Sequence, residues 1–549
     1  MQMMKYLFLI FGVVFISGCA AEKNSTYTKN SQLRREIIKV PSSINSSFDY
    51  ERAAILLRRT SFGVVPGQIA DVENEGAAKY LDEQLNPQFI DDSECDSMIS
   101  HLPALSMTPK ELYENYPPPF VIRKEEGKDA KIYPKRSTGE ILVELEAAKL
   151  VRDVYSKRQL QDVMTDFWLN HFNIYAIKSL VPYYLVDFTR RVRENALGKF
   201  SDLLKSVATS PAMLLYLDNT ESADPNFIDR KRLVLMKTRR ELGPFAERRA
   251  YLDKLGAAFF TSKGLNENYG RELLELHTVG LNYAQQDVIN AARSLTGWTV
   301  APIQDGGGFL YDDAMHDKGP KKVLGLEIPP DGGFDDGMKL LDYLANNPMT
   351  AHFISYELCR RFVSDNPPEE LVDKAAQTFL NTGGDIKKVL LTTFLSRDFT
   401  SRRYYKYKNP YEYVVSAIRA SNASFFPSKR LFGLIRSMGL VPYFVNSPKG
   451  YSENSRSWMD ADILLKHSNF ALALADNRIK GINIDYDEIF TNGNADTPRV
   501  LEKDFSDEVI GVPLDSTTQK VIEQESEQGD MPLPEIYALL LNSPEFQRR

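Results

Sequence analysis

The sequence predicts a mainly α-helical protein, a multi-helix body with a small β-hairpin insert near residues 297–328. Apolar residues recur three and four positions apart over most of residues 49–549, as they do on one face of a helix. Short runs typical of β-strands lie on either side of a glycine-rich turn, mainly within residues 297–328. Hydrophobic residues make up 43% of the 549-residue chain and charged residues 26%, which is the composition of a globular protein and excludes a chain disordered throughout.

The first residues have the pattern of a secretory signal. Lys5 precedes an apolar run, Tyr6–Ile16, that is shorter than the roughly 20 residues needed to span a bilayer. Ile16-Ser17-Gly18-Cys19 then resembles the bacterial lipobox, which implies cleavage before Cys19 and lipidation of its sulfur, and acyl chains would anchor the protein in a membrane. The alternatives are a signal peptide that happens to end in cysteine and an uncleaved anchor. Ala20, in place of an aspartate, favours the outer membrane of the cell envelope.

Three regions follow from this pattern. Residues 1–18 are the predicted lipoprotein signal peptide, and the polar residues 19–48 are the predicted flexible tether. The helical region 49–549 either is one body or divides into two lobes, 49–296 and 330–549, joined by the β insert. Cys95 and Cys359 remain after cleavage, and they either pair in an oxidising compartment or are two buried thiols.

Local signals place the individual elements. Asp49 can cap a first helix, which Ser61-Phe62-Gly63 ends. The turn signal Asp305–Gly308 separates the two strands of the predicted hairpin, and Ile482–Tyr486 alternates like a short strand. Further helices are predicted from Gly67 to Asn86, from Glu140 to Leu217 and after Pro330, with a long surface excursion over residues 103–139.

Composition and the absence of known motifs exclude several classes of function. The net charge of −7 provides no bulk positive field, so no nucleic-acid partner is expected. Three cysteines are too few for a cysteine-rich zinc or iron–sulfur site. The chain contains no P-loop, no His-Glu-x-x-His, no Gly-x-Ser-x-Gly and no Cys-x-x-Cys motif. Any catalytic site must therefore come from residues scattered along the chain.

Several sequence blocks together resemble one bacterial family, the domain of unknown function 1800 family. The blocks are Ala54–Gly63, Leu81–Leu85, Asp166–Phe172, Ser210–Asp218, Asn266–Thr278, Leu295–Trp298, His316-Asp317, Gly319–Lys321, Leu324-Gly325 and Ser543–Phe546. The resemblance implies a mainly helical secreted or envelope protein, often encoded beside a second uncharacterised, sulfatase-like family, whose product is the candidate partner. It implies no activity. The family often has a second histidine where Leu169 stands here.

Three histidines in these blocks are candidate metal ligands. His171 is either a buried histidine in an aromatic layer or a metal ligand or general base. His277 lies in the last turn of a helix, where the helix dipole favours a cation, and it is either a core residue or a ligand. His316 and Asp317 lie in an acidic loop that could bind a divalent ion or be a solvated turn. The predicted metal ligands are His171, His277, His316 and Asp317, with Glu272 as the possible catalytic base.

Two further segments are candidate binding sites. The loop around Asp224 and Asn226 could hold calcium, but it lacks the EF-hand spacing, so an Asx-turn is preferred. Residues 230–254 hold nine lysines and arginines against three acidic residues. They form either a solvated helical face or a contact for an anionic polymer, lipid head groups or an acidic partner. The candidate binding residues there are Arg239, Arg240, Arg248 and Arg249.

Two functions remain compatible with the sequence. The favoured one is a cell-envelope lipoprotein that assembles with or binds a partner at the membrane surface, since no known catalytic motif is present. The alternative is a metal-dependent hydrolase acting on an envelope or extracellular polymer, with one divalent ion as its cofactor. Convergence of His171, His277 and His316 in one cleft would favour the hydrolase. Whether the protein is an enzyme stays open at this point.

Overall fold

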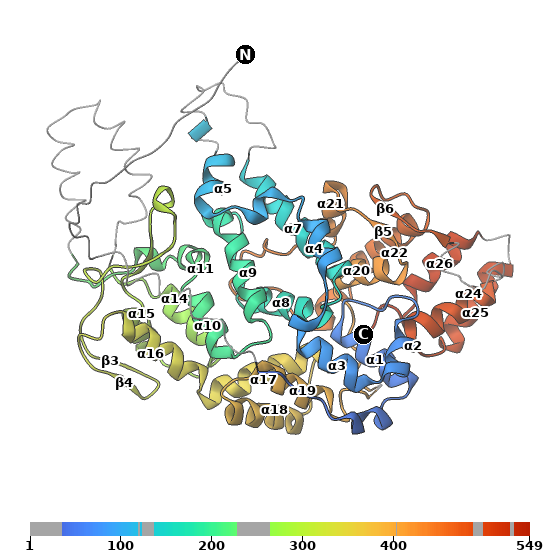
Figure 1. The fold of residues 1–549 in the computed structure, drawn as a ribbon, viewed down its shortest axis with the longest axis horizontal. Coiled ribbons are helices and arrows are strands. Elements are labelled where there is room, and N and C mark those ends of the chain that lie inside the picture. Colours follow the sequence, from blue (N-terminus) through green and yellow to red (C-terminus); the bar gives the residue numbers. More distant parts are fainter. Residues whose placement is uncertain are drawn as a thin grey trace, which may run out of the picture. The chain divides into compact units, whose positions relative to one another are not determined.

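Helices form most of the protein in a computed structural model that describes residues 36–118, 121–122, 137–227, 264–401, 403–486, 498–527 and 532–549 (Figure 1). These residues contain 22 α-helices and three two-stranded antiparallel sheets, which confirms the predicted mainly α fold. By their tertiary contacts, the described residues from Ile38 to Arg549 group into one compact unit. None of the helices in the described ranges is long and apolar enough to cross a membrane.

The helices have the following bounds. The first are α1 (Tyr50–Thr60), α2 (Gln68–Glu75), α3 (Ala77–Leu85), α4 (Ser93–Ile99) and α5 (Pro109–Asn115). The central ones are α7 (Thr138–Tyr155), α8 (Gln159–His171), α9 (Leu185–Asn195), α10 (Phe200–Ala208), α11 (Pro211–Tyr216), α14 (Asn268–Glu275) and α15 (Gln285–Ser294). The last are α16 (Phe334–Ala345), α17 (Pro348–Phe362), α18 (Glu369–Thr382), α19 (Ile386–Phe394), α20 (Pro410–Ala420), α21 (Lys429–Ser437), α22 (Ala461–Ala475), α24 (Pro498–Phe505), α25 (Ser516–Glu527) and α26 (Leu533–Asn542).

Local capping and glycine positions explain where the first helices begin and end. The carboxylate of Asp49 accepts a hydrogen bond from the backbone N–H of Arg52, so Asp49 caps α1 as predicted. The single helix predicted from Gly67 to Asn86 is instead two helices, α2 and α3. Gly76 separates them with a φ of 93°, a value that interrupts a right-handed helix and that glycine adopts at little cost.

The predicted β insert is present. Strand β1 (Trp298–Val300) pairs with β2 (Phe309–Tyr311), and β3 (Lys321–Val323) pairs with β4 (Leu326–Ile328), both antiparallel. The glycines of the predicted turn take the conformation that only glycine adopts easily, with φ of 106° at Gly306 and 69° at Gly307. The strand predicted at residues 482–486 is shorter, since β6 (Ile482–Asn483) pairs with β5 (Ser424–Phe425).

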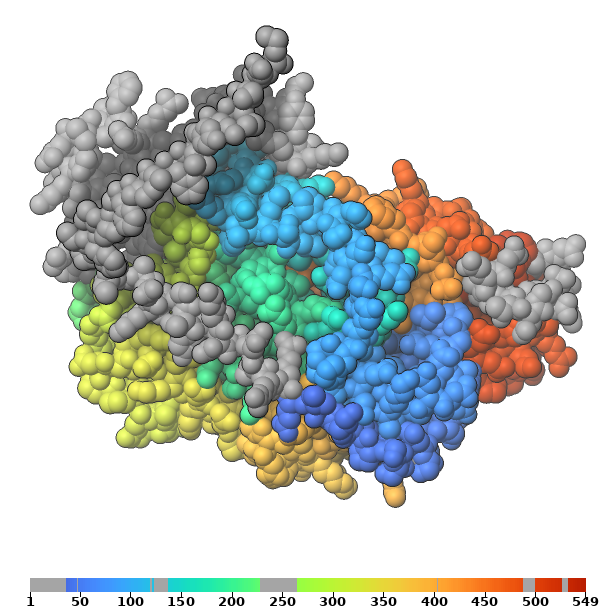
Figure 2. Space-filling model, in the orientation of Figure 1, coloured from blue at the N-terminus to red at the C-terminus, as the bar shows by residue number. Residues whose placement is uncertain are grey.

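The first helices pack against the last ones. The guanidinium of Arg58 on α1 is buried and donates hydrogen bonds to the carbonyl oxygens of Ile510 at 3.3 Å and Glu545 at 2.9 Å. Figures 1 and 2 show this neighbourhood, where the blue helices of residues 50–85 border the red C-terminal helices. A buried arginine whose donors are satisfied by backbone carbonyls holds two ends of the chain in one fixed register.

The predicted tether ends earlier than expected. Ile38 and Val40 are buried, and their N–H groups donate to the side chains of Asn86 at 3.2 Å and Asp82 at 2.7 Å. A 3-10 helix follows at Ser42–Ser47. Residues 38–48 therefore pack onto the folded unit, although they were predicted to be part of the tether of residues 19–48. The reason is that the side chains of Ile38 and Val40 are buried beside α3. Cys19 lies outside the described residues.

The two remaining cysteines are buried and unpaired. Cys95 lies on α4 and Cys359 on α17. Burial raises the pKa of each thiol to about 12, so neither is a thiolate at neutral pH. The alternative of two buried thiols is confirmed.

Close packing of α14 against α15 places the residues that follow α14. A Cβ atom added at Gly270 would lie 2.7 Å from the backbone N of Ala292 and 2.7 Å from the carbonyl oxygen of Val288. Glycine at this position therefore permits two helix backbones to approach more closely than any other residue would.

We expect Gly270→Ala to lower the free energy of unfolding by about 1–3 kcal/mol, because the added methyl group meets backbone that cannot move freely. The measurement is urea denaturation followed by circular dichroism. Gly433→Ala on α21 is the matched control, since a Cβ there meets nothing within 4 Å, and it should be neutral or stabilising. Equal effects of the two substitutions would contradict the packing argument.

Candidate functional site

The predicted metal ligands do not form one cluster. A metal site needs at least three histidine, cysteine, aspartate or glutamate side chains whose ligand atoms lie close together. Among the described residues, one such group has its ligand atoms within 4.8 Å of one another, and it consists of His352, Glu369 and Asp373. The expected set of His171, His277, His316 and Asp317 is therefore not assembled. The surroundings of each of the four give the physical reason.

His171 and His277 lie in an aromatic layer. The ring of His171 is 4.6 Å from that of Phe172 and 5.4 Å from that of Trp168, between centroids, and 6.3 Å from the ring of His277. The Nε2 atom of His171 lies 3.3 Å from the carbonyl oxygen of His277. Burial lowers the pKa of His171 to about 4, so this ring is neutral at pH 7. His171 therefore lies in an aromatic layer, as one of the two interpretations predicted, although its side chain is half-buried and not fully buried.

His277 lies just beyond the end of α14 rather than in its last turn, and it is uncharged. It is 1% exposed, and burial followed by the proximity of His171 lowers its pKa to about 3. The expectation of a cation at the helix end is therefore wrong, because desolvation outweighs the helix dipole. Glu272 is half-buried, and burial followed by repulsion from Glu275 raises the pKa of its carboxyl. Glu272 is not part of a metal-ligand group among the described residues.

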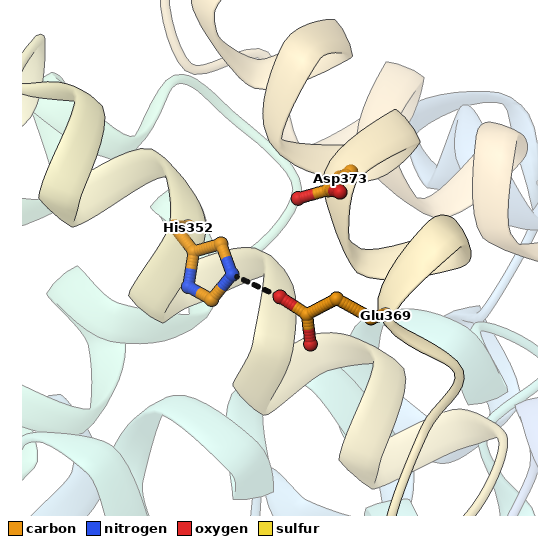
Figure 3. Close-up of side chains that lie close together, drawn as sticks. All are labelled: His352, Glu369 and Asp373. Atoms are coloured by element: carbon orange, nitrogen blue, oxygen red, sulfur yellow. Dashed lines mark hydrogen bonds and ion pairs between the residues drawn. The ribbon is translucent and has the colours of Figure 1, made fainter.

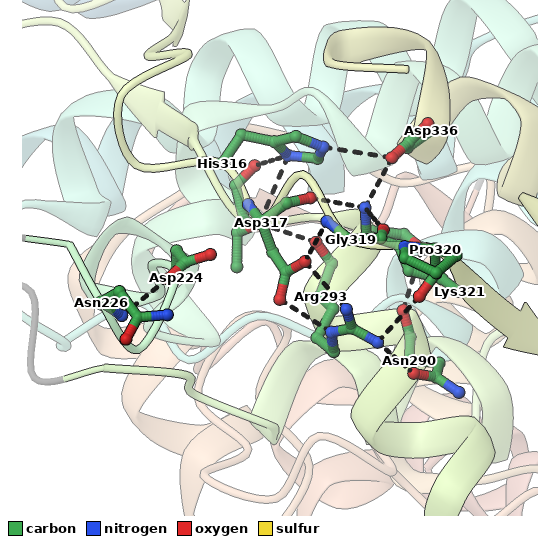
Figure 4. Close-up of polar contacts among 12 residues, drawn as sticks. Asp224, Asn226, Asn290, Arg293, His316, Asp317, Gly319, Pro320, Lys321 and Asp336 are labelled. Carbon is green, nitrogen blue, oxygen red and sulfur yellow. Dashed lines mark hydrogen bonds and ion pairs between the residues drawn. The ribbon is translucent and has the colours of Figure 1, made fainter. Parts of the chain in front are cut away.

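His316 belongs to a buried ionic network, drawn in Figure 4. Its Nδ1 lies 2.8 Å from the carbonyl oxygen of Thr296, and its Nε2 lies 3.2 Å from the carboxylate of Asp336. The ammonium of Lys321 lies 2.7 Å from the same carboxylate. The side chains of His316, Lys321 and Asp336 are 0% exposed. Both ring nitrogens thus contact protein oxygen atoms, so a metal ion could bind His316 only by displacing one of these contacts.

Asp317 is paired with an arginine. The Nε and Nη2 atoms of Arg293 lie 2.7 and 2.9 Å from the two carboxylate oxygens, a bidentate contact that Figure 4 shows. Although burial opposes ionisation, the hydrogen bonds from Arg293 and from the N–H of Gly319 hold the pKa of Asp317 below its ordinary value. Asp317, which was predicted as a metal ligand, therefore holds the loop of His316 and Asp317 to α15 through Arg293.

The structure describes one of the two other predicted binding segments, the loop around Asp224 and Asn226. The N–H of Asn226 donates to the carboxylate of Asp224 at 2.6 Å, so the preferred Asx-turn is present (Figure 4). The basic stretch lies outside the described residues. Its four candidate binding residues are Arg239, Arg240, Arg248 and Arg249.

A polar cavity lies beside α8, and we call it the α8 cavity. Its volume is about 40 Å³, counted as the space open to the centre of a water molecule. One water molecule needs roughly 10–15 Å³ of such space, so the cavity has room for about three water molecules. Charged, amide and tyrosine side chains dominate its wall. The lining residues are Lys149, Asp166, Leu169, Asn170, Asn173, Asn409, Tyr411, Leu440, Pro442, Tyr443, Tyr451, Ser452 and Glu453.

Lys149 is the centre of this wall. Its ammonium lies 2.6 Å from Asp153 on its own helix α7 and 2.8 Å from Asp166 on α8. It also lies over the ring of Tyr411 on α20, at 4.4 Å, and 5.2 Å from the ring centre of Phe62. Although burial opposes its charge, the two carboxylates raise the pKa of Lys149 above its ordinary value. A buried cation therefore joins three helices.

Two carboxylates share this one cation, and the pKa of the deeper one, Asp153, is raised. The side chain of Asp153 is 3% exposed, whereas that of Asp166 is 24% exposed. Burial raises the pKa of Asp153 to about 7, although Lys149 opposes the shift, and Asp162 and Asp166 add to it. The hydroxyl of Tyr411 donates to Asp153 at 2.5 Å. The group is thus poised to titrate near neutral pH.

A second buried ionic group borders the cavity through Glu453. Arg361 forms an ion pair with Glu412 and lies 3.8 Å from Glu453, and Lys406 also lies 3.8 Å from Glu453. Although burial opposes ionisation, Arg361 and then Arg549 hold the pKa of Glu412 at about 2. Burial lowers the pKa of Lys406 to about 8. Cations and anions therefore nearly balance around the cavity.

Two asparagines of α8 and the turn after it hold the chain segment that closes the cavity. Asn170 donates to the carbonyl oxygen of Tyr451 at 3.0 Å and accepts from its N–H at 2.6 Å. Asn173 donates to the carbonyl oxygens of Val445 and Ser447 at 2.9 and 2.8 Å. Side-chain amides thus hold the segment between α21 and α22. They form the hydrogen bonds to its backbone that a neighbouring strand would form in a sheet.

Sequence reasoning missed this cavity, although one signal for it was present. The block Asp166–Phe172 was used for its histidine, but Asp166 and Asn170 are four residues apart and so share a helix face next to that of His171. Nothing local marks Lys149 or Glu453, which enter the wall from α7 and from the segment before α22.

Comparison with known proteins identifies one family. A family model described as "Protein of unknown function (DUF1800)" matches residues 55–548. No curated protein and no solved structure matches the chain.

We expect the contribution of Asp153 to stability to fall as the pH rises from about 4 to about 7, whereas His171 and His277, whose folded-state pKa values are lowered, contribute in the opposite direction. Since the folded-state pKa of Asp153 lies near 7 and an unfolded aspartate titrates near pH 4, the folded state binds more protons in this window. The slope from this one group is at most about 1.4 kcal/mol per pH unit. The measurement is urea denaturation at intervals between pH 4 and pH 8.

Asp153→Asn should remove this contribution, so that stability increases more, or decreases less, with rising pH than in the wild type, because the amide accepts the same hydrogen bonds but does not titrate. Asp462→Asn on α22 is the control, an exposed carboxylate paired with Lys466. An unchanged slope in Asp153→Asn would show that another group causes the pH dependence.

Proposed function

The chain belongs to the DUF1800 family, whose description assigns no activity, and from this premise we propose that it is a lipid-anchored binding protein of the bacterial cell envelope. Its ligand is the saccharide part of an envelope or extracellular polymer, held at the α8 cavity. The observation that carries the proposal is a cavity in which amides, carboxylates, an ammonium and three tyrosines meet. The lipid anchor at Cys19 rests on the lipobox resemblance.

The chemistry of the wall suits hydroxyl groups. Lys149 has three N–H donors, of which two point to Asp153 and Asp166. Asp166 and Glu453 keep 24% and 16% of their side chains exposed, so they supply acceptors. A hydroxyl both donates and accepts, and a near-neutral cavity with both kinds of partner favours it over an ion.

The size of the cavity sets how much of a ligand enters. Space for about three water molecules admits one hydroxymethyl or hydroxyl group but not a whole sugar ring. The rest of the saccharide would lie outside the cavity, where the partly exposed ring of Tyr451 could offer an apolar face. The proposed complex is therefore one projecting group of a polymer inserted into the protein.

The metal-dependent hydrolase has less support. Its four ligands are not assembled among the described residues, and His316 and Asp317 are occupied by Asp336 and Arg293. Binding at the cavity needs no metal ion. A partner protein encoded nearby remains compatible with this proposal, since an envelope binding protein can present a polymer to a second protein.

Calorimetric titration of the purified protein with cellotetraose, maltotetraose and chitotetraose tests the proposal. We expect at least one to bind, and Asp166→Asn to weaken that binding about tenfold or more, since a hydrogen bond to a charged group contributes about 1.5–3 kcal/mol. Glu453→Gln should act in the same direction.

Asp462→Asn serves again as the control, because its carboxylate is exposed on α22 away from the wall residues. Thermal unfolding of each variant verifies that it is folded. Absence of binding to all three saccharides at millimolar concentration, or equal affinity of Asp166→Asn and the wild type, would contradict a saccharide site here.

A further inference from the structure

A cluster of one histidine and two carboxylates lies apart from the α8 cavity, on the pair of helices α17 and α18. His352 is on α17, and Glu369 and Asp373 are on α18. Since Glu369 and Asp373 are four residues apart, they share one face of their helix. Figure 3 shows the three side chains converging from the two helices. One ligand atom from each lies within 4.8 Å of the other two.

We propose that His352, Glu369 and Asp373 bind a divalent transition-metal ion of the Zn²⁺ class. Nitrogen and carboxylate oxygen bind Zn²⁺ at about 2.0–2.2 Å, which places ligand atoms of a tetrahedral site about 3.2–3.6 Å apart. The Nε2 atom of His352 already lies 3.0 Å from Oε1 of Glu369. Rotation of the side chains can bring the ligand atom of Asp373 within the same range of the other two, because all three residues are solvent-exposed.

The donor set determines the class of metal. An imidazole favours zinc, copper, nickel or iron, whereas magnesium and calcium prefer oxygen alone. Three protein ligands leave at least one coordination position for water or for a group of a partner. The site is therefore an open one, unlike the closed four-ligand sites that support folding.

The charge around the cluster is an independent argument for a cation. Within the described ranges, neither Glu369 nor Asp373 lies within 4.0 Å of a lysine or arginine, and the nearby Lys374 pairs with Glu370 at 2.7 Å instead. Among the described residues, the carboxylate of Glu369 pairs with the imidazole of His352, and that of Asp373 forms no ion pair. A divalent ion would neutralise both of them and join α17 to α18.

This site differs from the metal centre expected from the sequence. His352 was given no role there, because its acidic partners are 17 and 21 positions away and come together only when α17 packs on α18. The inference does not depend on saccharide binding, since none of the three residues lines the α8 cavity.

Calorimetric titration of the whole protein with ZnCl₂ alone, at pH 7.5 after treatment with a chelator, tests the inference. We expect a site of one ion per chain that His352→Ala weakens by at least about tenfold, since loss of even an outer partner of a ligand costs about 10- to 100-fold in affinity. Glu369→Gln should also weaken it. Binding should weaken in acid, because protons compete with the metal ion for its ligands.

Two controls match these variants. His101→Ala removes another exposed histidine that belongs to no such cluster, and Glu370→Gln removes the neighbouring carboxylate paired with Lys374. Both should bind Zn²⁺ like the wild type. Circular dichroism verifies that the variants are folded. Wild-type affinity in His352→Ala would place the ion elsewhere, and no binding by the wild type at 1 mM Zn²⁺ would rule the site out.

Discussion

The ammonium of Lys149 between Asp153 and Asp166 is the interaction on which the centre of the protein depends. It ties α7 to α8 and, over the ring of Tyr411, to α20. Removing one partner of such a buried group leaves an unpaired charge in a medium of low dielectric constant, which costs about 3–5 kcal/mol. Replacing the whole group by apolar side chains often costs nothing. The arrangement is therefore better explained by what it does at the cavity than by stability alone.

The ionic groups that border the cavity leave two of their carboxylates partly exposed. One cation faces two carboxylates at Lys149, and the second ionic group shares Glu453 between Arg361 and Lys406. Fully satisfied networks pack tightly, whereas these leave Asp166 and Glu453 partly open to solvent. A ligand with hydroxyl groups would complete the pairing that the protein leaves incomplete.

Helices and turns could be predicted because their causes are local. Asp49 caps α1 through a residue three positions away, and the glycines at 306 and 307 turn the chain between β1 and β2. The division of α2 from α3 at Gly76 was missed, since a single glycine is tolerated in some helices and ends others. Residues 38–48 were assigned to a tether because their composition is polar, although Ile38 and Val40 are buried.

The candidate sites show where sequence reasoning ends. It selected His171, His277 and His316 for their chemistry, but a histidine ligates a metal only where its nitrogen lone pair is free, and the partner of His316 is a carboxylate 20 residues away. The sequence by itself determined the helical fold, the hairpin insert and the family, because these follow from patterns along the chain. Only the tertiary structure decided which charges meet at the α8 cavity and on α17 and α18. Each group joins residues from separate helices, and an electrostatic interaction depends on distance in space.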